Sequence, residues 1–504
     1  MKCIAGEHRT QSILFPDSLD NYVTQNNPVR VIDAYVDSLD LKQLEFTIST
    51  AQTGRPPYNP ADILKIYIYG YLNKIRSSRR LEQETTRNLE LMWLIKKLSP
   101  DHKTIAKFRH DNPKALKNTF KDFVKLCIKL DLYSKELIAI DGSKFKAVNS
   151  KANNFTKKKL DSLIARLDKK IDEINQEMDN IDKKETKQEE NTKTTAKTEQ
   201  ETKEILNQHL TELYARKKVY QGYAEKLKQT KETQISLTDH DSRLMISNDK
   251  ADVCYNIQTA VDAKNKLVAE FEVTNAINDL NLLSVITKKA AQTLEVPKLA
   301  ATADKGYASA TDIVSCVTKG FEVHVAGGEF DVCVPCKEEQ AETVLSHTGG
   351  RCVYLAERNL VLCPMGKVLY PHSYDKTTKD GVFYNSVACK SCVCRCTKAK
   401  FKRFSIAMRE EAFSRVYDEG GLFVRRFRVR SDKGVVLLRK CLCEHPFGSL
   451  KRGFGMGYCL LRGVEKVRGE FSLSFLVYNL RRVLNIVGVS KLLQTIQSYN
   501  RLLF

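Results

Sequence analysis

A strand pattern that is split in two by a long inserted segment most constrains how this chain can fold. Leu137–Ile140 are four consecutive apolar residues, typical of a buried strand, and Asp141-Gly142 directly after them is expected to end that strand. Residues 253–261 and 267–273 resume the strand pattern around a polar turn, which predicts a hairpin. The segments before and after the insertion must therefore return to the same sheet.

The residues after this hairpin alternate between helical and strand patterns. Residues 279–294 and 308–318 are predicted helices, whereas residues 299–303 and 321–326 are predicted strands. Asp304 follows the first of these two strands directly. A hairpin followed by alternating helices and strands predicts a mixed sheet with helices on its faces, and therefore an α+β fold.

Two stretches with heptad spacing lie within the inserted segment. The apolar residues of the first stretch, spaced alternately by four and three, are Leu160, Ile164, Leu167, Ile171, Ile174, Met178 and Ile181. Residues 206–227 repeat the spacing with a break at Lys217, and residues 183–204 between them are almost wholly polar. The pattern predicts an antiparallel helical hairpin with a polar tip. Such a hairpin is either a dimerisation or DNA-contacting arm, or a spacer inserted into a loop.

The first 132 residues or so show helical patterns throughout. An amphipathic stripe follows Pro60, and Ser99-Pro100-Asp101 is a start signal for a further helix that carries Lys107 and Arg109. A set of short helices ending in a basic one is compatible with a helix-turn-helix that reads DNA through Lys107 and Arg109. A plain helical domain with a solvated basic face fits the pattern equally well.

The cysteines are concentrated in one region. The chain has 15 of them, and eight lie between Cys333 and Cys396. Their spacing includes two Cys-x-x-Cys pairs, Cys333 with Cys336 and Cys389 with Cys392. We expect a cytoplasmic protein, because the chain begins without a signal peptide's apolar core and has no membrane-length apolar run. In a reducing compartment the four cysteines are candidates for one structural Zn²⁺ site, the alternative being free thiols.

The charge of the chain favours a polyanionic partner. The formal net charge is +21, and residues 400–440 are strongly basic with phenylalanines among the cations. The basic residues taken as DNA-contact candidates in and just after this region are Arg425, Arg426, Arg428, Arg439 and Lys440. Phosphate contacts with some base stacking would suit this composition, so we expect nucleic acid as the partner.

Three carboxylates are candidates for a metal site. Asp141 and Asp304 each follow a predicted strand, and Glu444 is expected near the start of a later helix, because Pro446 is awkward inside one. Lys451 is seven residues after Glu444 and would lie on the same helix face. Carboxylates are the ligands that Mg²⁺ prefers, and paired Mg²⁺ ions serve phosphodiester chemistry.

Several short stretches carry a resemblance to a known family. They are Asp141-Gly142-Ser143-Lys144, Tyr255-Asn256-Ile257-Gln258, Ala303-Asp304-Lys305-Gly306-Tyr307 and Glu444-His445-Pro446-Phe447-Gly448 with Lys451. With them the sequence resembles a DDE transposase of a bacterial insertion sequence. One branch of that family carries a Tyr, Arg, Glu, Lys signature. Glu444 and Lys451 keep its Glu-x6-Lys spacing, whereas Lys440 occupies the position four before Glu444 and Arg439 is one residue earlier.

The resemblance implies a fold, a site and an activity. It implies an RNase H-like catalytic domain with Asp141, Asp304 and Glu444 as the DDE triad, which would hold two Mg²⁺ ions, and Lys451 beside the DNA. It implies cleavage at the terminal inverted repeats of an element and transfer of the 3′-OH ends into target DNA. We expect double-stranded DNA as the partner and a homodimer on it. The alternatives are a nuclease of the same fold without strand transfer, and a catalytically inactive regulator derived from a transposase.

The chain is then expected to divide into four regions. Residues 1–132 would be a helical, DNA-binding domain, and residues 133–150, 236–329 and 435–504 would together form the catalytic domain. Residues 151–235 would be the inserted heptad hairpin, and residues 330–434 an inserted region that is Cys-rich, basic and rich in strands.

Overall fold

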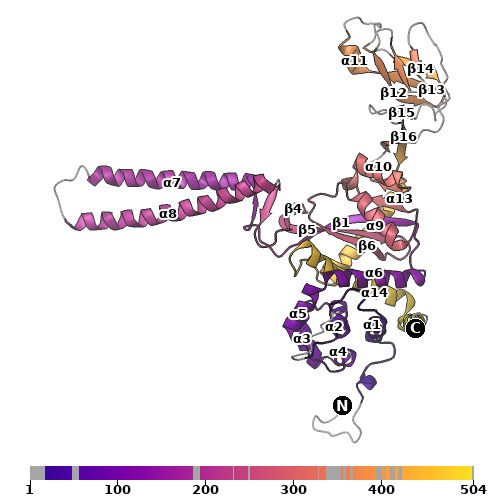
Figure 1. Ribbon diagram of the computed structural model, residues 1–504, viewed down its shortest axis with the longest axis horizontal. Coiled ribbons are helices and arrows are strands. Elements are labelled where there is room, and N and C mark those ends of the chain that lie inside the picture. The colour runs from indigo at the N-terminus through magenta and orange to yellow at the C-terminus, as the bar shows by residue number, and fades with distance from the viewer. Residues whose placement is uncertain are drawn as a thin grey trace, which may run out of the picture.

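The computed structural model shows a central body with a long helical arm and a small outer β unit (Figure 1). It describes residues 18–47, 56–185, 193–230, 232–247, 250–326, 329–335, 353–355, 359–363, 367–392, 400–401, 403–408, 415–417 and 423–501. None of the helices in these ranges is long and apolar enough to cross a membrane.

The N-terminal part is helical, as predicted. After a short 3-10 turn, η1 (Leu19–Tyr22), its helices are α1 (Pro28–Asp37), α2 (Pro60–Leu72), α3 (Ser78–Arg87), α4 (Leu89–Leu94), α5 (His102–Asp111) and α6 (Pro113–Lys129). Local signals set their starts: α2 has Pro60 at its first position with Asn59 as N-cap, and the Asp101 carboxylate accepts from the Thr104 N–H to cap α5.

The central sheet joins segments from both sides of the helical arm. Its strands are β1 (Leu137–Lys146), β4 (Arg243–Ser247), β5 (Lys250–Asp262), β6 (Val268–Thr274), β7 (Ala300–Ala303) and β8 (Glu322–Val325). β5 is antiparallel to β1. On the side of β5 that faces away from β1, β4 pairs with its first half and β6 with its second half. On the other side of β1, β7 is parallel to both β1 and β8. The sheet is therefore mixed, as expected. The expectation that β1 ends at Asp141 is wrong, because its pairing with β5 continues to Lys146.

Helices cover both faces of this sheet. They are α9 (Leu283–Leu294), α10 (Ala310–Thr318), α13 (Lys433–Gly448) and α14 (Val464–Val487), whereas α15 (Val489–Arg501) packs against α1 and α14. The expectation that a helix begins near Glu444 is also wrong. α13 begins eleven residues earlier, capped by Asp432, and contains both Glu444 and Pro446 in its last turns. It passes directly into a π-type turn, η4 (Ser449–Gly453).

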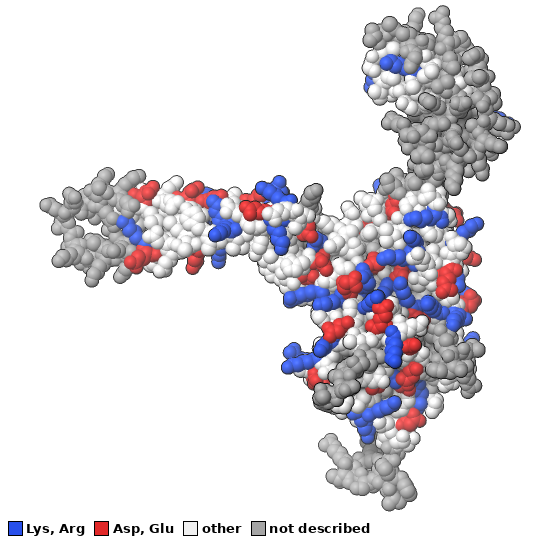
Figure 2. Space-filling view, in the orientation of Figure 1, with Lys and Arg blue, Asp and Glu red and all other residues white. Residues whose placement is uncertain are grey.

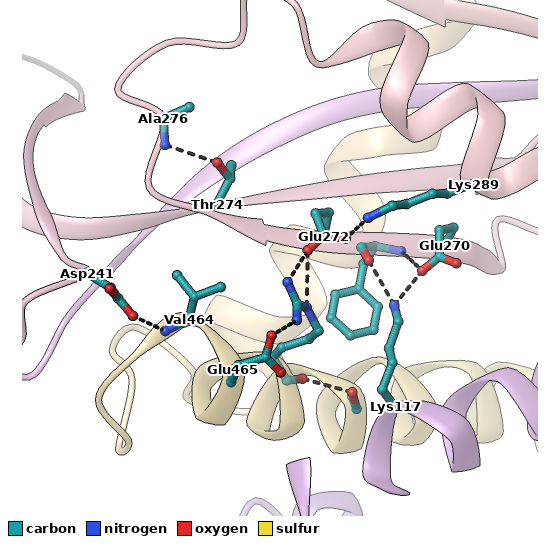
Figure 3. Close-up of polar contacts among 12 residues, drawn as sticks. Lys117, Asp241, Glu270, Glu272, Thr274, Ala276, Lys289, Val464 and Glu465 are labelled. Atoms are coloured by element: carbon teal, nitrogen blue, oxygen red, sulfur yellow. Dashed lines mark hydrogen bonds and ion pairs between the residues drawn. The ribbon is translucent and has the colours of Figure 1, made fainter. Parts of the chain in front are cut away.

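Partly buried ion pairs fasten α6 and α14 to β6 (Figure 3). Lys117 of α6 pairs with the carboxylate of Glu270, donates to the Phe271 carbonyl at 2.8 Å and lies 3.4 Å from the Phe271 ring centroid. Arg468 of α14 donates two hydrogen bonds to Glu272 Oε1, at 2.6 and 3.1 Å, and Lys289 of α9 pairs with the same carboxylate. One hydrophobic core runs from the N-terminal helices through the sheet, so residue 132 is not a boundary between separate cores.

The arm consists of two long helices on a short two-stranded base. α7 (Lys157–Glu185) and α8 (Lys193–Thr230) lie along one another, and β2 (Asn154–Thr156) pairs with β3 (Gln234–Ser236) where the arm meets the body (Figure 1). The heptad residues Leu167 and Ile171 pack against Leu210 and Leu213. Lys217, which breaks the heptad pattern, forms an ion pair with Asp168 across the helices at 2.6 Å. Residues 186–192 of the expected polar tip lie outside the described residues.

The outer β unit is built from two small sheets. β9 (Glu329–Pro335), β15 (Arg415–Tyr417) and β16 (Phe423–Arg430) form the sheet nearer the body. β10 (Val353–Leu355), β11 (Leu360–Leu362), β12 (Val368–Asp375), β13 (Asp380–Tyr384) and β14 (Arg403–Ala407) form the other, with α11 (Ser386–Lys390) following β13. The chain enters the unit after β8 and leaves it through β16, directly before α13.

Candidate active site

Two aspartates are brought together by the pairing of parallel strands. The last paired residues of β1 and β7 are Ala139 and Thr302, and Asp141 and Asp304 each lie two residues further on. Neighbouring strands are about 4.8 Å apart, so the two aspartates lie side by side where β7 ends. Ala139, on the same face of β1 as Asp141, packs against Leu442 and Cys443, and this face therefore looks toward α13.

An arginine of α13 lies between the two carboxylates. The Nη1 atom of Arg439 is 3.6 Å from Asp141 Oδ2, and its Nη2 atom is 3.7 Å from Asp304 Oδ1. The side chain of Arg439 is buried, and its Nε atom has no hydrogen-bond partner among the described residues. The guanidinium therefore acts as a cation that bridges both carboxylates at distances longer than good hydrogen bonds.

Burial dominates the electrostatics of Asp141. It raises the pKa of the Asp141 carboxyl to about 6, while Arg439 and the N–H of Gly142, which donates to Asp141 Oδ1 at 2.9 Å, act in the opposite direction. The charges of Asp279 and Asp304 add to the increase in this pKa. Asp141 is thus a carboxylate that gains from a nearby cation, as a metal ligand in a buried site does.

Glu444 belongs to the same helix as Arg439 but, unlike Arg439, makes no ion pair with Asp141 or Asp304. It directly follows Cys443, which packs on Ala139 of β1, and its own carboxylate is exposed and forms no ion pair with the described residues. No three His, Cys, Asp or Glu side chains in the described ranges are grouped closely enough to hold a metal ion, and this includes the three expected triad members. The structure therefore joins Asp141 with Asp304 and brings the helix of Glu444 onto their strands.

Lys451 reaches the same strand from the π-type turn. Its Nζ atom donates to Ser143 Oγ at 2.7 Å and lies 4.7 Å from the Phe145 ring centroid. Burial lowers the pKa of Lys451, against the opposing charges of Cys254 and Asp141. Pro446 removes one N–H of the α13 ladder, and the wider turn that follows orients Lys451 toward β1.

A polar network lies beneath Gly142, on the other face of β1. Asp279 Oδ1 accepts from Asn256 Nδ2 and from Gln258 Nε2, each at 2.7 Å, and the Tyr307 hydroxyl donates to Gln258 Oε1. This network connects the two Asp-containing segments, because Gly142 follows Asp141 and Tyr307 ends the turn after Asp304. Sequence reasoning singled out the stretches of Asn256, Gln258 and Tyr307 but missed Asp279, whose place in a loop before α9 carries no motif.

The other basic candidates have different surroundings. Lys107 and Lys440 are exposed. Arg425, Arg426 and Arg428 lie on β16, and their side chains are outside the part of the structure that is described. Arg109 is a correction: it is buried, donates to the Tyr71 hydroxyl at 2.9 Å and lies over the Tyr67 ring, so its side chain belongs to the helical core and not to a DNA-facing surface.

The four zinc candidates do not lie in one element. Cys333 is on β9 in the sheet nearer the body, whereas Cys389 is on α11 and Cys392 follows it at the far sheet (Figure 1). Cys336 lies outside the described residues. No zinc-binding group is found among the cysteines that the structure describes.

Two stretches of the chain match the models of known protein families. Residues 17–111 match the model of a transposase domain, DUF772, and residues 362–484 match that of a transposase DDE domain. The second match contains Arg439, Glu444 and Lys451, whereas Asp141 and Asp304 lie outside both matched ranges. The chain is therefore a transposase. More particularly, it is a DDE transposase of the insertion-sequence kind.

Comparisons with individual proteins add little. No curated protein matches the chain. Among solved structures, the chain is similar to the piggyBac transposase in its cryo-EM synaptic complex with hairpin DNA, at 8% sequence identity and a TM-score of 0.29, over 94% of this chain and 79% of that one. A TM-score at this level does not establish a shared fold.

Proposed function

We propose that this transposase binds the terminal inverted repeats of an insertion sequence, cleaves DNA strands by Mg²⁺-dependent hydrolysis and transfers the 3′-OH ends into target DNA. The observation that carries the proposal is the pair of carboxylates, Asp141 and Asp304, on adjacent parallel strands with the Arg439 guanidinium between them. A cation already occupies the position where a divalent metal would be needed.

The sheet order supports an RNase H-like catalytic domain. β6, β5 and β1 are successive antiparallel neighbours, and β7 and β8 continue parallel to β1 on its other side. This is the strand order that the resemblance implies, with the acidic residues on the central strand and its parallel neighbour. Along the chain, the arm is inserted between β1 and β4, and the outer β unit between β8 and α13.

The residues present fit a divalent metal. Two carboxylates, one of them half-buried with a raised pKa, offer the oxygen ligands that Mg²⁺ takes, and Glu444 on α13 would complete the set. When bound there, Mg²⁺ supplies activation of the attacking oxygen and stabilisation of the leaving one. Arg439 would leave its bridging position and turn to a DNA phosphate, and Lys451, beside Ser143, would hold the backbone near Asp141.

The surface charge fits DNA only in part. On the face drawn in Figure 2, Lys and Arg are spread over the body with Asp and Glu between them, so this face is not a uniformly basic groove. We infer a double-stranded DNA partner from the net charge of +21 and from the exposed Lys107 and Lys440. A homodimer acting on two DNA ends belongs to the same proposal.

The test is a cleavage and joining assay on duplexes taken from the DNA that flanks the gene. Asp141→Asn, Asp304→Asn and Glu444→Gln are each expected to reduce Mg²⁺-dependent cleavage to background while DNA binding stays within a few-fold of wild type. Asp252→Asn is the matched control, because that carboxylate lies 3.6 Å from Lys151 Nζ, away from the site. Near wild-type cleavage by any one of the three variants would remove that residue from the site.

Joining of a pre-cut 3′ end to a second duplex separates transposition from hydrolysis alone. A wild-type protein that cleaves but never joins would be a nuclease. One that binds without cleaving in Mg²⁺ or Mn²⁺ would be an inactive regulator.

A further inference from the structure

One face of the outer five-stranded sheet carries aromatic rings and an arginine. Alternate residues of its strands point inward, where Leu369, Phe383 and Phe404 form a small buried core. On the opposite face, Tyr370 of β12, Tyr384 of β13 and Arg403 of β14 lie in one cross-strand row, because Tyr384 pairs in register with both of the others. We call these three residues, with His372 and Phe401, the aromatic face.

Three rings of the aromatic face are already stacked on one another in the protein alone. Tyr384 lies between His372, with ring centroids 4.0 Å apart, and Phe401, with centroids 4.7 Å apart, and both pairs are within about 31° of parallel. The Arg403 guanidinium is 5.4 Å from the Phe401 centroid and 5.8 Å from that of Tyr384. Tyr370 remains 49% exposed at the end of the row. The face thus offers the rings of Tyr370 and His372 and the planar cation of Arg403 to the solvent, while Tyr384 and Phe401 are half-buried.

The surroundings of this face are basic. Within the described parts of residues 353–408 there are six Lys or Arg side chains and two Asp side chains, a net charge of +4. The basic residues are Lys367, Lys376, Lys379, Lys390, Lys400 and Arg403, and all of them are exposed. Binding of an apolar protein partner would not explain the positive charge. Binding of a phosphate backbone alone would not explain the stacked rings.

We propose that the aromatic face binds unpaired bases of a DNA strand, with the surrounding lysines contacting its phosphates. Rings that stack on successive bases, combined with cations that follow the backbone, are the general means of holding single strands. Arg403 serves both purposes, since its guanidinium can stack on a base and pair with a phosphate.

The place of the face in the chain suits a cleaved DNA end. The outer unit leaves through β16 directly into α13, the helix that carries Arg439 and Glu444. This proposal rests on the proposed function, because DNA must be cut or opened near the carboxylates to provide unpaired bases.

The test measures fluorescence anisotropy of a labelled oligo-dT, about 15 nucleotides long, with the full chain. Tyr370→Ala and Arg403→Lys are each expected to weaken its binding by roughly 5- to 50-fold. Arg403→Lys keeps the charge and loses the planar cation, so its effect reports stacking and not attraction to phosphate. Tyr214→Ala is the control, because Tyr214 on α8 is similarly exposed, at 51%, and is far from this sheet.

Each outcome decides the matter. Binding of oligo-dT by both variants within about twofold of wild type overturns the proposal, as does a wild-type protein that binds duplex ends but not oligo-dT; the latter leaves the proposed function intact. Conversion of a wild-type dimer to a monomer by Tyr370→Ala, seen by light scattering, would make the face a contact between copies and also overturn it. A protein that binds oligo-dT through this face but never cleaves DNA would support this inference and refute the proposed function.

Discussion

Gly142 is a residue whose lack of a side chain shapes the candidate active site. A Cβ atom there would lie 2.7 Å from Asp279 Oδ1 and 2.9 Å from Asn256 Oδ1, and closer still to Gln258 Nε2. Gly142→Ala is therefore expected to break the network under Asp141 and to lower the free energy of unfolding by about 1–3 kcal/mol. Urea unfolding measures this. Gly306→Ala is the control, because its Cβ would meet only Asp279 Oδ2, at an ordinary 3.8 Å, and an equal loss in both variants would contradict the argument.

Asp141 is expected to make stability fall as the pH rises. Its folded pKa, raised by burial to about 6, exceeds that of an unfolded Asp, about 3.9, so between these values the folded state binds more protons and the free energy of unfolding decreases with pH. Relative to Asp141→Asn, the wild type should lose roughly 2 kcal/mol between pH 4 and pH 7 without divalent ions. Urea unfolding at both pH values tests this, and equal pH dependences of the two proteins would refute it.

At the scale of single residues, the sequence indicated the two aspartates of the candidate site but not the residues that contact them. Asp304 could be found because it follows a short apolar strand, and Asp141 because it follows another. Arg439 was expected to contact DNA, yet it bridges both aspartates. That contact depends on how α13 packs over a sheet whose strands are far apart in sequence, which spacing alone does not encode. Asp279 was missed for the same reason, since only the fold brings its loop beneath Gly142.

Among the elements, the arm was the most predictable, because a heptad seam specifies its own partner. Ile171 is buried against Leu210 and Leu213, and Ile174 packs beside it. Ile171→Glu with Ile174→Glu is expected to lower the melting temperature of the arm while the molecular mass in solution stays the same, since the seam pairs within one chain. Light scattering with circular dichroism measures both, and Tyr214→Glu on the exposed side of α8 is the control. Dissociation of a dimer by the double variant would show pairing between chains.

The elements that were misjudged have physical explanations. β1 was expected to end at Asp141, but cross-strand pairing with β5 maintains it to Lys146. α13 was expected to begin at Glu444 because of Pro446, yet a proline in the last turns removes only one ladder bond, and the helix passes into a π-type turn instead. In β1 tertiary pairing outweighed the local signal, whereas in α13 the local cost of the proline was small.

Bound zinc remains a prediction for the outer β unit. Metal analysis of the purified chain is expected to find about one Zn²⁺ per molecule if Cys333, Cys336, Cys389 and Cys392 hold it, because four thiolates close a tetrahedral site. Cys389→Ser with Cys392→Ser should release it, whereas Cys441→Ser, an exposed cysteine on α13, should not. Purified wild-type protein without zinc would contradict the prediction.

At the scale of the whole molecule, buried charges join the two sides of the division expected at residue 132. Arg76, which precedes α3, donates to the buried Glu470 carboxylate of α14 at 2.6 Å and to the carbonyls of Gly455 and Tyr458. Glu470 also accepts from the Leu460 and Leu461 N–H groups. The N-terminal helices thus share buried charges with α14 and one core with the central sheet, and these parts should unfold together.

Glu470→Gln tests whether the N-terminal helices and the central sheet unfold together. Removing one partner of a buried ion pair leaves the Arg76 charge uncompensated, and the free energy of unfolding should fall on the order of 3 kcal/mol. Because the helices and the sheet share one core, hydrogen exchange of α2 and of β5 should accelerate to the same extent. Glu465→Gln, an exposed partner of Arg468 on the same helix, is expected to change little. Faster exchange in α2 alone would mean that the helical part opens independently and that residue 132 marks a true domain boundary.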